Sequence, residues 1–194
     1  MWSVVPFKIK LWIIIPFSIL LYLLFSTVIG FDLIKSITTT ASVTGISALL
    51  FGEYAWKYIY MIKPEFFEKY ICPDLNGQWL AKIESNFDGE TTVELPLEIK
   101  ASFFSIKMIM HTNYGKSNTS ICRISKEDDG SFELNYMYRV QNDRAKRGDA
   151  QSYDGAARVN LINSEIKELN GVFFTNRCWR EGKNTAGNVS ITKQ

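Results

Sequence analysis

The sequence contains little of the chemistry on which most enzymes and metalloproteins depend. Among 194 residues there is one histidine, His111, and there are three cysteines, which are widely spaced and form no C-x-x-C pair. Zinc sites and Ser-His-Asp or Cys-His catalysis need clusters of these residue types, which a single histidine cannot supply. No two acidic residues are marked as a general acid and base. We therefore expect no enzyme activity, no catalytic residues, no metal and no cofactor.

A glycine-rich phosphate loop, internal repeats and a surplus of basic residues are also missing. Residues 74–194 carry sixteen basic and sixteen acidic side chains. A charge-balanced segment offers no extended basic face for DNA or RNA, so an anionic ligand must meet a local pocket. An odd number of widely spaced cysteines is typical of a reducing compartment. These features exclude nucleic-acid polymers as partners and favour the cytoplasm for this part of the chain.

Long apolar runs are present only at the front of the sequence. Residues 11–31 have no formal charge, and about twenty helical residues suffice to cross roughly 30 Å of hydrocarbon. A second stretch, residues 36–62, is richer in serine and threonine and carries Glu53 and Lys57 on one helical face. We predict a transmembrane hairpin over residues 1–63, with spans at about 11–31 and 36–62.

Lysines flank this hairpin on one side. Lys8 and Lys10 precede the first span, whereas Lys57, Lys63 and Lys69 follow the centre of the second. The positive-inside rule therefore predicts that both termini face the cytoplasm and that the hairpin tip faces out. A cleaved secretory signal is the alternative, since it also has a basic start and an apolar run. The length of the run, the lack of a clear cleavage motif and the second apolar segment argue against it.

The rest of the chain changes from helical to alternating periodicity. Residues 64–73 mix lysine, glutamate and aromatic residues and end in proline, which indicates a juxtamembrane linker or a short interfacial helix. From residue 74 onward, alternating segments are separated by Gly, Asn and Asp clusters. About eight short antiparallel strands, each with one buried face, favour an all-β domain over residues 74–194 that closes into a small barrel, with an open sandwich as the alternative. The predicted strands are residues 77–85, 91–100, 103–112, 119–126, 131–141, 153–163, 168–175 and 188–193.

Alternation also predicts which side chains face inward. The inward set includes Val93, Leu95, Leu97 and Ile99, then Phe104, Ile106, Met108 and Met110, then Phe132, Leu134, Tyr136, Tyr138 and Val140. Tyr136 and Tyr138 share this face, where a hydroxyl needs a partner or a wet cavity. They are candidates for stacking on a planar ligand, with ordinary core tyrosines as the alternative.

Other candidate binding residues come from residue chemistry. Trp79 near the start of the first strand is either a plug at one end of the barrel or a stacking residue. Arg158 lies on a predicted strand, where a guanidinium presents a planar fork suited to phosphate oxygens. The same applies to a basic cluster between the fifth and sixth strands, which is otherwise a solvated turn: Arg144, Lys146 and Arg147.

Two stretches of sequence carry a family resemblance that covers essentially the whole chain. Leu75-Asn76-Gly77-Gln78-Trp79, after two spans and a short acidic and aromatic linker, resembles the two-transmembrane, β-strand-rich (SMODS-associating) effectors of bacterial CBASS antiphage systems. The segment LNGVFFTNR, ending at Arg177, followed by Thr185-Ala186-Gly187-Asn188-Val189, looks like the end of that family's barrel. Between them, residues 178–184 form a longer connection than the resemblance leads us to expect.

The resemblance implies a function. A cytoplasmic barrel would bind a cyclic dinucleotide made by a partner nucleotidyltransferase, and binding would drive homo-oligomerisation, disruption of the bacterial inner membrane and abortive infection. Close helix approach is favoured by small residues in the second span, Ala41, Gly45 and Ala48. The implied ligand-binding residues are Thr175 and Arg177, with Trp79, and they join Tyr136, Tyr138 and Arg158.

Two other functions remain open from the sequence. Gly-x-Trp on a first strand also resembles lipocalins, which favours a membrane-tethered carrier or sensor of a small apolar ligand. A structural or assembly protein whose β-domain binds another protein is the second alternative.

Overall fold

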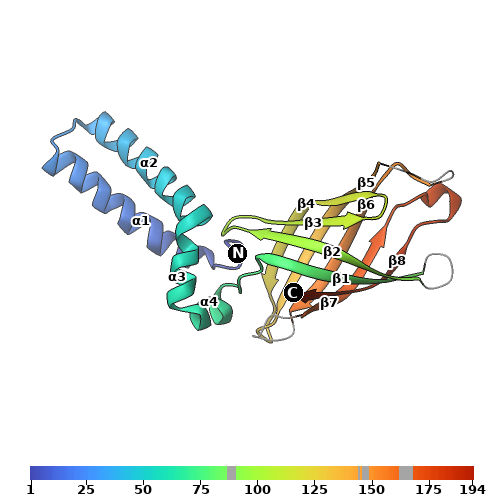
Figure 1. The fold of residues 1–194 in the computed structure, drawn as a ribbon. Helices are drawn as coiled ribbons and strands as arrows, with labels where there is room; N and C mark the ends of the chain where they lie inside the picture. The colour runs from blue at the N-terminus through green and yellow to red at the C-terminus, as the bar shows by residue number, and fades with distance from the viewer. Residues whose placement is uncertain (87–90, 144, 146–148, 162–167) are drawn as a thin grey trace.

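The computed structural model describes residues 1–86, 91–143, 145, 149–161 and 168–194. It consists of a helical hairpin and a β-barrel, with both chain ends near the junction of the two (Figure 1). The first helix comprises α1 (Phe7–Leu23) and the π-helical segment η1 (Leu24–Val28). The second comprises α2 (Leu33–Leu50), the π-helical segment η2 (Phe51–Ala55) and α3 (Trp56–Ile62), and α4 (Pro64–Tyr70) folds back beside it.

Both helices have the length and composition of membrane spans. Phe7–Val28 has a mean hydropathy of 2.3 and Leu33–Ile62 of 1.3, and hardly any of either is buried within the protein. Gly30, with φ of 77°, turns the chain between them, and the Asp32 carboxylate accepts a hydrogen bond from the Lys35 N–H at 2.9 Å to cap α2. The apolar side chains of both helices therefore face outward, as contact with lipid requires. This exposure indicates that the protein associates with a membrane.

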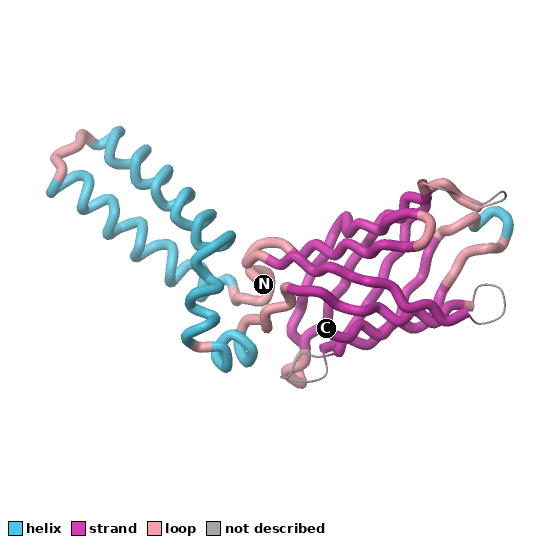
Figure 2. Tube along the Cα trace, in the orientation of Figure 1, coloured by secondary structure: helices cyan, strands magenta, loops and turns pink. Residues whose placement is uncertain are grey.

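The β-domain is a closed barrel in which each strand is antiparallel to the next and β8 returns to pair with β1 (Figure 2). Closure removes the unpaired edges that an open sheet would expose. The sandwich alternative is thereby wrong, and the predicted small barrel is confirmed. The strands are β1 (Gly77–Ser85), β2 (Thr91–Ala101), β3 (Ile106–Thr112), β4 (Gly115–Lys126), β5 (Phe132–Asn142), β6 (Ser152–Leu161), β7 (Glu168–Thr175) and β8 (Ala186–Lys193).

The third predicted strand, residues 103–112, begins too early, because its first residues belong to a turn that contacts the helices. Phe103 and Phe104 were expected to begin the third strand, with Phe104 facing inward, but β3 begins at Ile106. Phe103 is 4% exposed and Phe104 40% exposed in the turn after β2, where both pack against the helices. These apolar residues continue the alternating pattern of the strands, but they are apolar because they pack against the helices. β4 and β8 also begin earlier than predicted, at Gly115 and Ala186.

The barrel end nearest the helices, here called the proximal end, is tied to them by two segments. The N-terminal residues 1–5 lie against it: the Trp2 N–H donates to the Phe103 carbonyl at 2.7 Å, and Met1 is 3% exposed. The Phe103 N–H donates in turn to the Gly52 carbonyl of η2 at 2.8 Å. A Cβ at position 52 would lie 1.9 Å from the Phe104 ring, so only glycine admits this ring against the helix. We call Gly52, Phe103 and Phe104 the helix–barrel joint.

Candidate ligand-binding site

The barrel interior is packed differently in its two halves. In the proximal half the inward side chains are close-packed, and Trp79, Leu134, Val159 and Leu169 are each 0% exposed. In the half farther from the helices, the distal half, several inward residues keep partial exposure although they point into the barrel. Solvent therefore reaches this part, which we call the distal interior. Its partly exposed members include Ile83, Met110, Thr112, Tyr136, Tyr138 and Tyr153.

Two tyrosines of β5 dominate the distal interior. The ring centroids of Tyr136 and Tyr138 lie 5.8 Å apart with an interplanar angle of 40°. Gly155 of β6 makes room for Tyr138, because a Cβ there would lie 2.4 Å from its Cζ. Burial raises the pKa of both phenols well above their ordinary value. Both hydroxyls therefore stay protonated at neutral pH and can donate hydrogen bonds, while the rings offer faces for stacking.

A threonine pair joins the ends of β7 and β8 beside these rings. The Thr175 and Thr185 hydroxyl oxygens are 2.7 Å apart, and both residues are buried. The Thr175 hydroxyl also accepts hydrogen bonds from the backbone N–H groups of Thr185, at 3.3 Å, and Arg177, at 3.4 Å. Thr175 therefore holds the chain leading to Arg177 in a fixed position at the distal end.

Arg177 forms a two-pronged ion pair with Asp149 at this end. Its Nε donates to Asp149 Oδ1 at 2.7 Å and its Nη2 donates to Oδ2. Its guanidinium carbon lies 5.7 Å from the Tyr153 ring centroid. The hydrogen bonds from Arg177 hold the pKa of the Asp149 carboxyl below its ordinary value of 3.8. Asp149 thus orients a guanidinium beside an aromatic ring, an arrangement suited to a phosphate and a base.

The Asp149–Arg177 pair gives the stability of the barrel an acid-dependent component. A carboxyl whose pKa is lowered by folding stabilises the folded state above its unfolded pKa, and this contribution is lost as the pH falls through the folded pKa. We expect Asp149→Asn to lower the melting temperature at pH 7 by about 2–4 °C, since a partly exposed pair contributes on the order of 1 kcal/mol. Below pH 3.8 the difference between variant and wild type should shrink. Thermal melts from pH 7 to pH 2.5 measure this, and a constant difference would contradict it.

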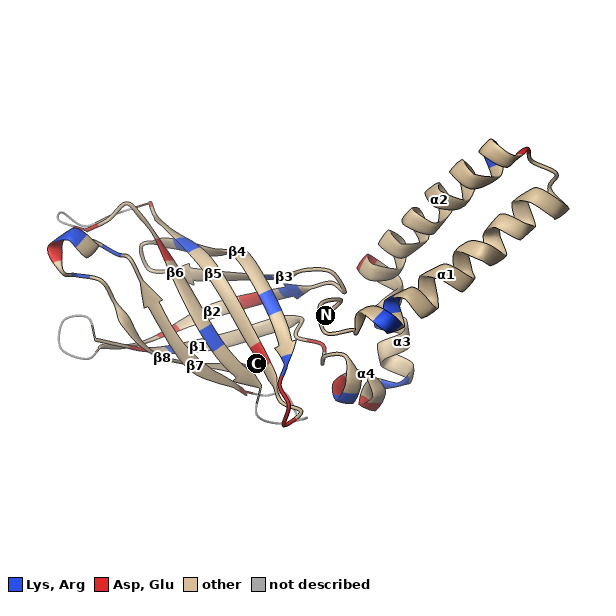
Figure 3. Ribbon diagram, turned by 180° about the vertical axis from the view of Figure 1, so that it is seen from behind, with Lys and Arg blue, Asp and Glu red and all other residues tan. Residues whose placement is uncertain are grey.

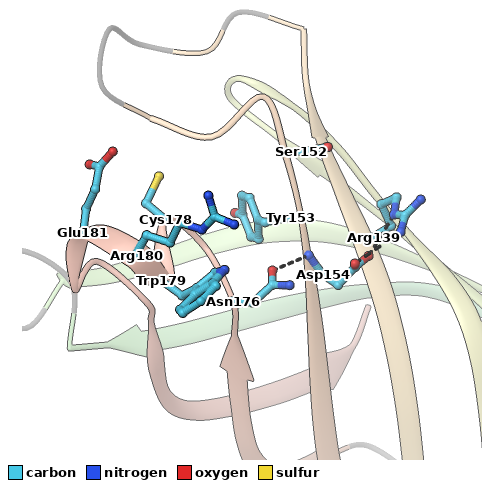
Figure 4. Close-up of a pocket in the computed structure, with 9 residues that line it drawn as sticks. All are labelled: Arg139, Ser152, Tyr153, Asp154, Asn176, Cys178, Trp179, Arg180 and Glu181. Carbon is cyan, nitrogen blue, oxygen red and sulfur yellow. Dashed lines mark hydrogen bonds and ion pairs between the residues drawn. The ribbon is translucent and has the colours of Figure 1, made fainter.

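A polar pocket with a volume of about 440 Å³ lies on the outer rim of the distal end (Figure 4). Trp179 of η3 (Trp179–Glu181) is 63% exposed there, and the Arg180 guanidinium carbon is 5.5 Å from its ring centroid. Asn176 accepts a hydrogen bond from the Asp154 N–H at 2.8 Å at its base. Its volume suits a small ligand. We call it the rim pocket, and its lining residues are Arg139, Ser152, Tyr153, Asp154, Asn176, Cys178, Trp179, Arg180 and Glu181.

The structure brings some of the predicted site residues together and separates others. Tyr136, Tyr138, Thr175 and Arg177 lie in the distal half. Trp79 lies in the proximal half, where its indole N–H donates to the Leu75 carbonyl at 3.0 Å, so it fills the barrel end.

Arg158 is not among the inward-facing residues. It lies on the outer face, 3.5 Å from Glu133, because the inward residues of β6 are Gly155, Ala157, Val159 and Leu161. It therefore cannot contribute to an interior site with the tyrosines. The predicted basic cluster of Arg144, Lys146 and Arg147 lies outside the described residues.

Sequence reasoning missed three members of the site. Tyr153 has the same inward parity as Gly155, so alternation along β6 was sufficient to find it. Gly155 carries no side chain, and its role emerges only from its contact with Tyr138. Asp149 lies in a loop 28 residues from Arg177, and no local pattern connects the two. Within the described ranges, no three His, Cys, Asp or Glu side chains are grouped as metal ligands.

Two helices suited to a bilayer and a closed barrel with a solvent-accessible, aromatic and polar distal half define a membrane-associated receptor for a small ligand. Comparison with known proteins makes this more specific. Residues 70–193 match the family model described as Cap15, cyclic dinucleotide receptor domain. The chain is 44% identical to CD-NTase-associated protein 15 of Escherichia albertii over 194 residues, which are 100% of this chain and 98% of that protein. It is 24% identical to CD-NTase-associated protein 15 of Yersinia aleksiciae over 155 residues, 78% of this chain and 71% of that protein.

The chain belongs to the Cap15 family. The predicted resemblance to CBASS effectors is thereby confirmed, and so is the prediction of a cyclic dinucleotide receptor domain, which the family model places on the barrel.

Proposed function

We propose that this protein is an antiphage effector whose barrel binds a cyclic dinucleotide in the distal interior. A partner nucleotidyltransferase supplies the ligand, and binding leads to self-association of the hairpins, disruption of the inner membrane and abortive infection. The observation that carries the proposal is the solvent-accessible, tyrosine-lined distal half of the barrel. A cyclic dinucleotide presents two base faces, which suit the tyrosine rings, and two phosphates, which suit protonated hydroxyls and Arg177.

The proposed topology places the receptor in the cytoplasm. Basic residues gather at the start of α1 and around α4, next to the barrel (Figure 3). Lys8, Lys10, Lys57, Lys63 and Lys69 belong to this side of the hairpin, and the positive-inside rule assigns it to the cytoplasm. On this proposal residues 1–63 are the transmembrane hairpin, 64–73 the connection and 74–194 the receptor. The receptor then faces the compartment in which a cytoplasmic enzyme makes the ligand.

The helix–barrel joint supports a direct connection between ligand binding and the hairpin. Phe103 packs against Phe51, with ring centroids 5.4 Å apart, and against the buried Trp56 at 6.4 Å. Phe103 and Phe104 of the joint lie between β2 and β3, which are part of the closed barrel. A rearrangement of the barrel on binding would therefore move η2 and the helix that contains it.

Replacing Tyr138 tests the ligand site. We expect Tyr138→Ala to weaken binding of a cyclic dinucleotide by about 5- to 150-fold, because loss of one aromatic stacking contact costs about 1–3 kcal/mol. The measurement is titration calorimetry on the full chain in detergent, with cyclic di-AMP, cyclic di-GMP, cyclic di-UMP and cyclic UMP–AMP as probes. Arg123→Ala, on the outer face of β4, is the matched control and should bind as the wild type does.

Other results of this experiment would change the proposal. If Arg180→Ala weakens binding and Tyr138→Ala does not, the ligand occupies the rim pocket. If the protein binds fatty acids and none of the cyclic dinucleotides, the apolar-ligand carrier is the correct function.

A further inference from the structure

Four outward side chains form a continuous apolar row across the barrel wall. The strand register places Ile121 opposite Met137, Met137 opposite Ala156, and Ala156 opposite Phe174. Residues paired in this way point to the same side of a sheet. Ile121 is 63% exposed, Met137 51% and Phe174 62%, so the row is open to solvent. We call these four residues the outer row.

The outer row is set back from the proximal end of the barrel. Met137 lies midway along β5 (Phe132–Asn142), separated from the proximal end by about 16 Å of strand at 3.3 Å per residue. On the proposed topology, in which the bilayer surrounds the two helices, lipid does not cover these side chains. Large apolar residues exposed side by side on a soluble surface are typical of a protein interface.

On both sides of the outer row, a charged residue on β5 lies beside a residue of opposite charge on β6. On the proximal side, Glu133 of β5 lies 3.5 Å from Arg158 of β6. On the distal side, Arg139 of β5 lies 2.8 Å from Asp154 of β6. Each border therefore places one sign on β5 and the opposite sign on β6.

A shared membrane restricts how two copies of such a barrel can meet. Both hairpins have the same orientation in the bilayer, so a pair of copies is related by a two-fold axis along the membrane normal. An axis between β5 and β6 places β5 of one copy against β6 of the other. Arg139 then faces Asp154 of the partner subunit, and Met137 faces the smaller Ala156 of the partner subunit.

We infer that the outer row is the surface through which two receptor barrels of this protein associate. The occupant is a second copy, because the register places Arg139 level with Asp154 and Met137 level with Ala156, so the two-fold axis brings each into contact with its complement on the partner subunit. The inference rests on the proposed function, in that it names the surface used in self-association. Two barrels joined in this way bring two hairpins side by side.

Cysteine cross-linking of the full chain in membrane vesicles tests this surface. In a Cys178→Ser background, Met137→Cys is treated with a short bis-maleimide, with and without the four cyclic dinucleotides used above. Lys82→Cys, exposed on β1 across the barrel, is the matched control. We expect Met137→Cys to give at least about tenfold more cross-linked dimer than the control when nucleotide is bound, since interface residues dominate association energies.

A charge variant provides the second measurement. Met137→Glu places an unpaired carboxylate in the contact and should reduce nucleotide-dependent assembly, measured by light scattering in detergent, by at least about tenfold. Its affinity for nucleotide should stay within about twofold of the wild type, since Met137 points away from the interior. Leu80→Glu, an outward apolar-to-acid change on β1, should assemble normally.

The outcomes separate this inference from the proposed function. If nucleotide stabilises the chain against heating but Met137→Cys cross-links no more than Lys82→Cys, the outer row is not the contact and the proposed function stands. If no nucleotide stabilises the chain, the proposed function fails. Cross-linking without nucleotide at raised protein density then decides the inference: an excess at Met137→Cys supports it, and equality with the control overturns it.

Discussion

Replacing Trp79 with alanine is expected to lower the free energy of unfolding of the barrel by about 4 kcal/mol, as is usual for large aromatic residues in close-packed cores. Trp79 is 0% exposed, and its indole N–H donates to the Leu75 carbonyl at 3.0 Å. The substitution leaves a cavity where the first strand meets the chain from the helices, and it leaves that carbonyl without its donor. Urea unfolding followed by far-UV circular dichroism in detergent measures the loss.

Trp179→Ala is the matched control for this experiment. Trp179 is 63% exposed, and truncation of an exposed side chain usually changes stability by no more than about 0.5 kcal/mol. If Trp79→Ala proved as stable as this control and bound nucleotide poorly, Trp79 would be a ligand-stacking residue and not a plug.

Replacing Gly52 with leucine is expected to separate ligand binding from membrane disruption. A side chain at position 52 occupies the space of the Phe104 ring and displaces it from the helix. Leucine favours helix more than glycine does, so the second helix itself is retained. We expect nucleotide-dependent assembly to fall by about 5- to 150-fold, the usual range for coupling between two sites. Light scattering measures this assembly, and survival of cells that also express an active nucleotidyltransferase should rise with its loss.

Binding and rescue experiments complete this test. Nucleotide affinity of Gly52→Leu should equal that of the wild type, because the distal interior lies at the other end of the barrel. Adding Phe104→Ala removes the ring with which leucine collides, and the double variant should recover much of the activity. An equally inactive double variant would show that Gly52 acts within the membrane and not through the joint.

The fold was largely predictable because each part has a clear hydrophobic pattern in the sequence. Uninterrupted apolar sequence indicates spans, and alternation around hairpin turns indicates strands, so both the hairpin and the barrel follow from local patterns. Phe103 and Phe104 were assigned wrongly because alternation reports burial and not the partner that provides it. Their partners, Trp2 and Gly52, are distant in sequence.

The candidate site was predictable only where it lies on strands. Tyr136 and Tyr138 face inward because they alternate with charged or exposed neighbours, and the same rule applied to β6 gives Tyr153 inward and Arg158 outward. Asp149 and Arg177 meet through two separate loops. Their pairing depends on closure of the barrel, which no short segment encodes.

The position of residues 1–5 at the proximal end makes their docking a late step of folding. Ser3 donates a hydrogen bond to the Ile124 carbonyl of β4 at 2.9 Å, and the barrel containing that strand closes only when β8 pairs with β1. Residues 1–5 precede every strand in the chain and are therefore made before the surface that they contact is complete. That surface forms only when β8 has been made and has closed the barrel, so these residues are among the last to reach their final place.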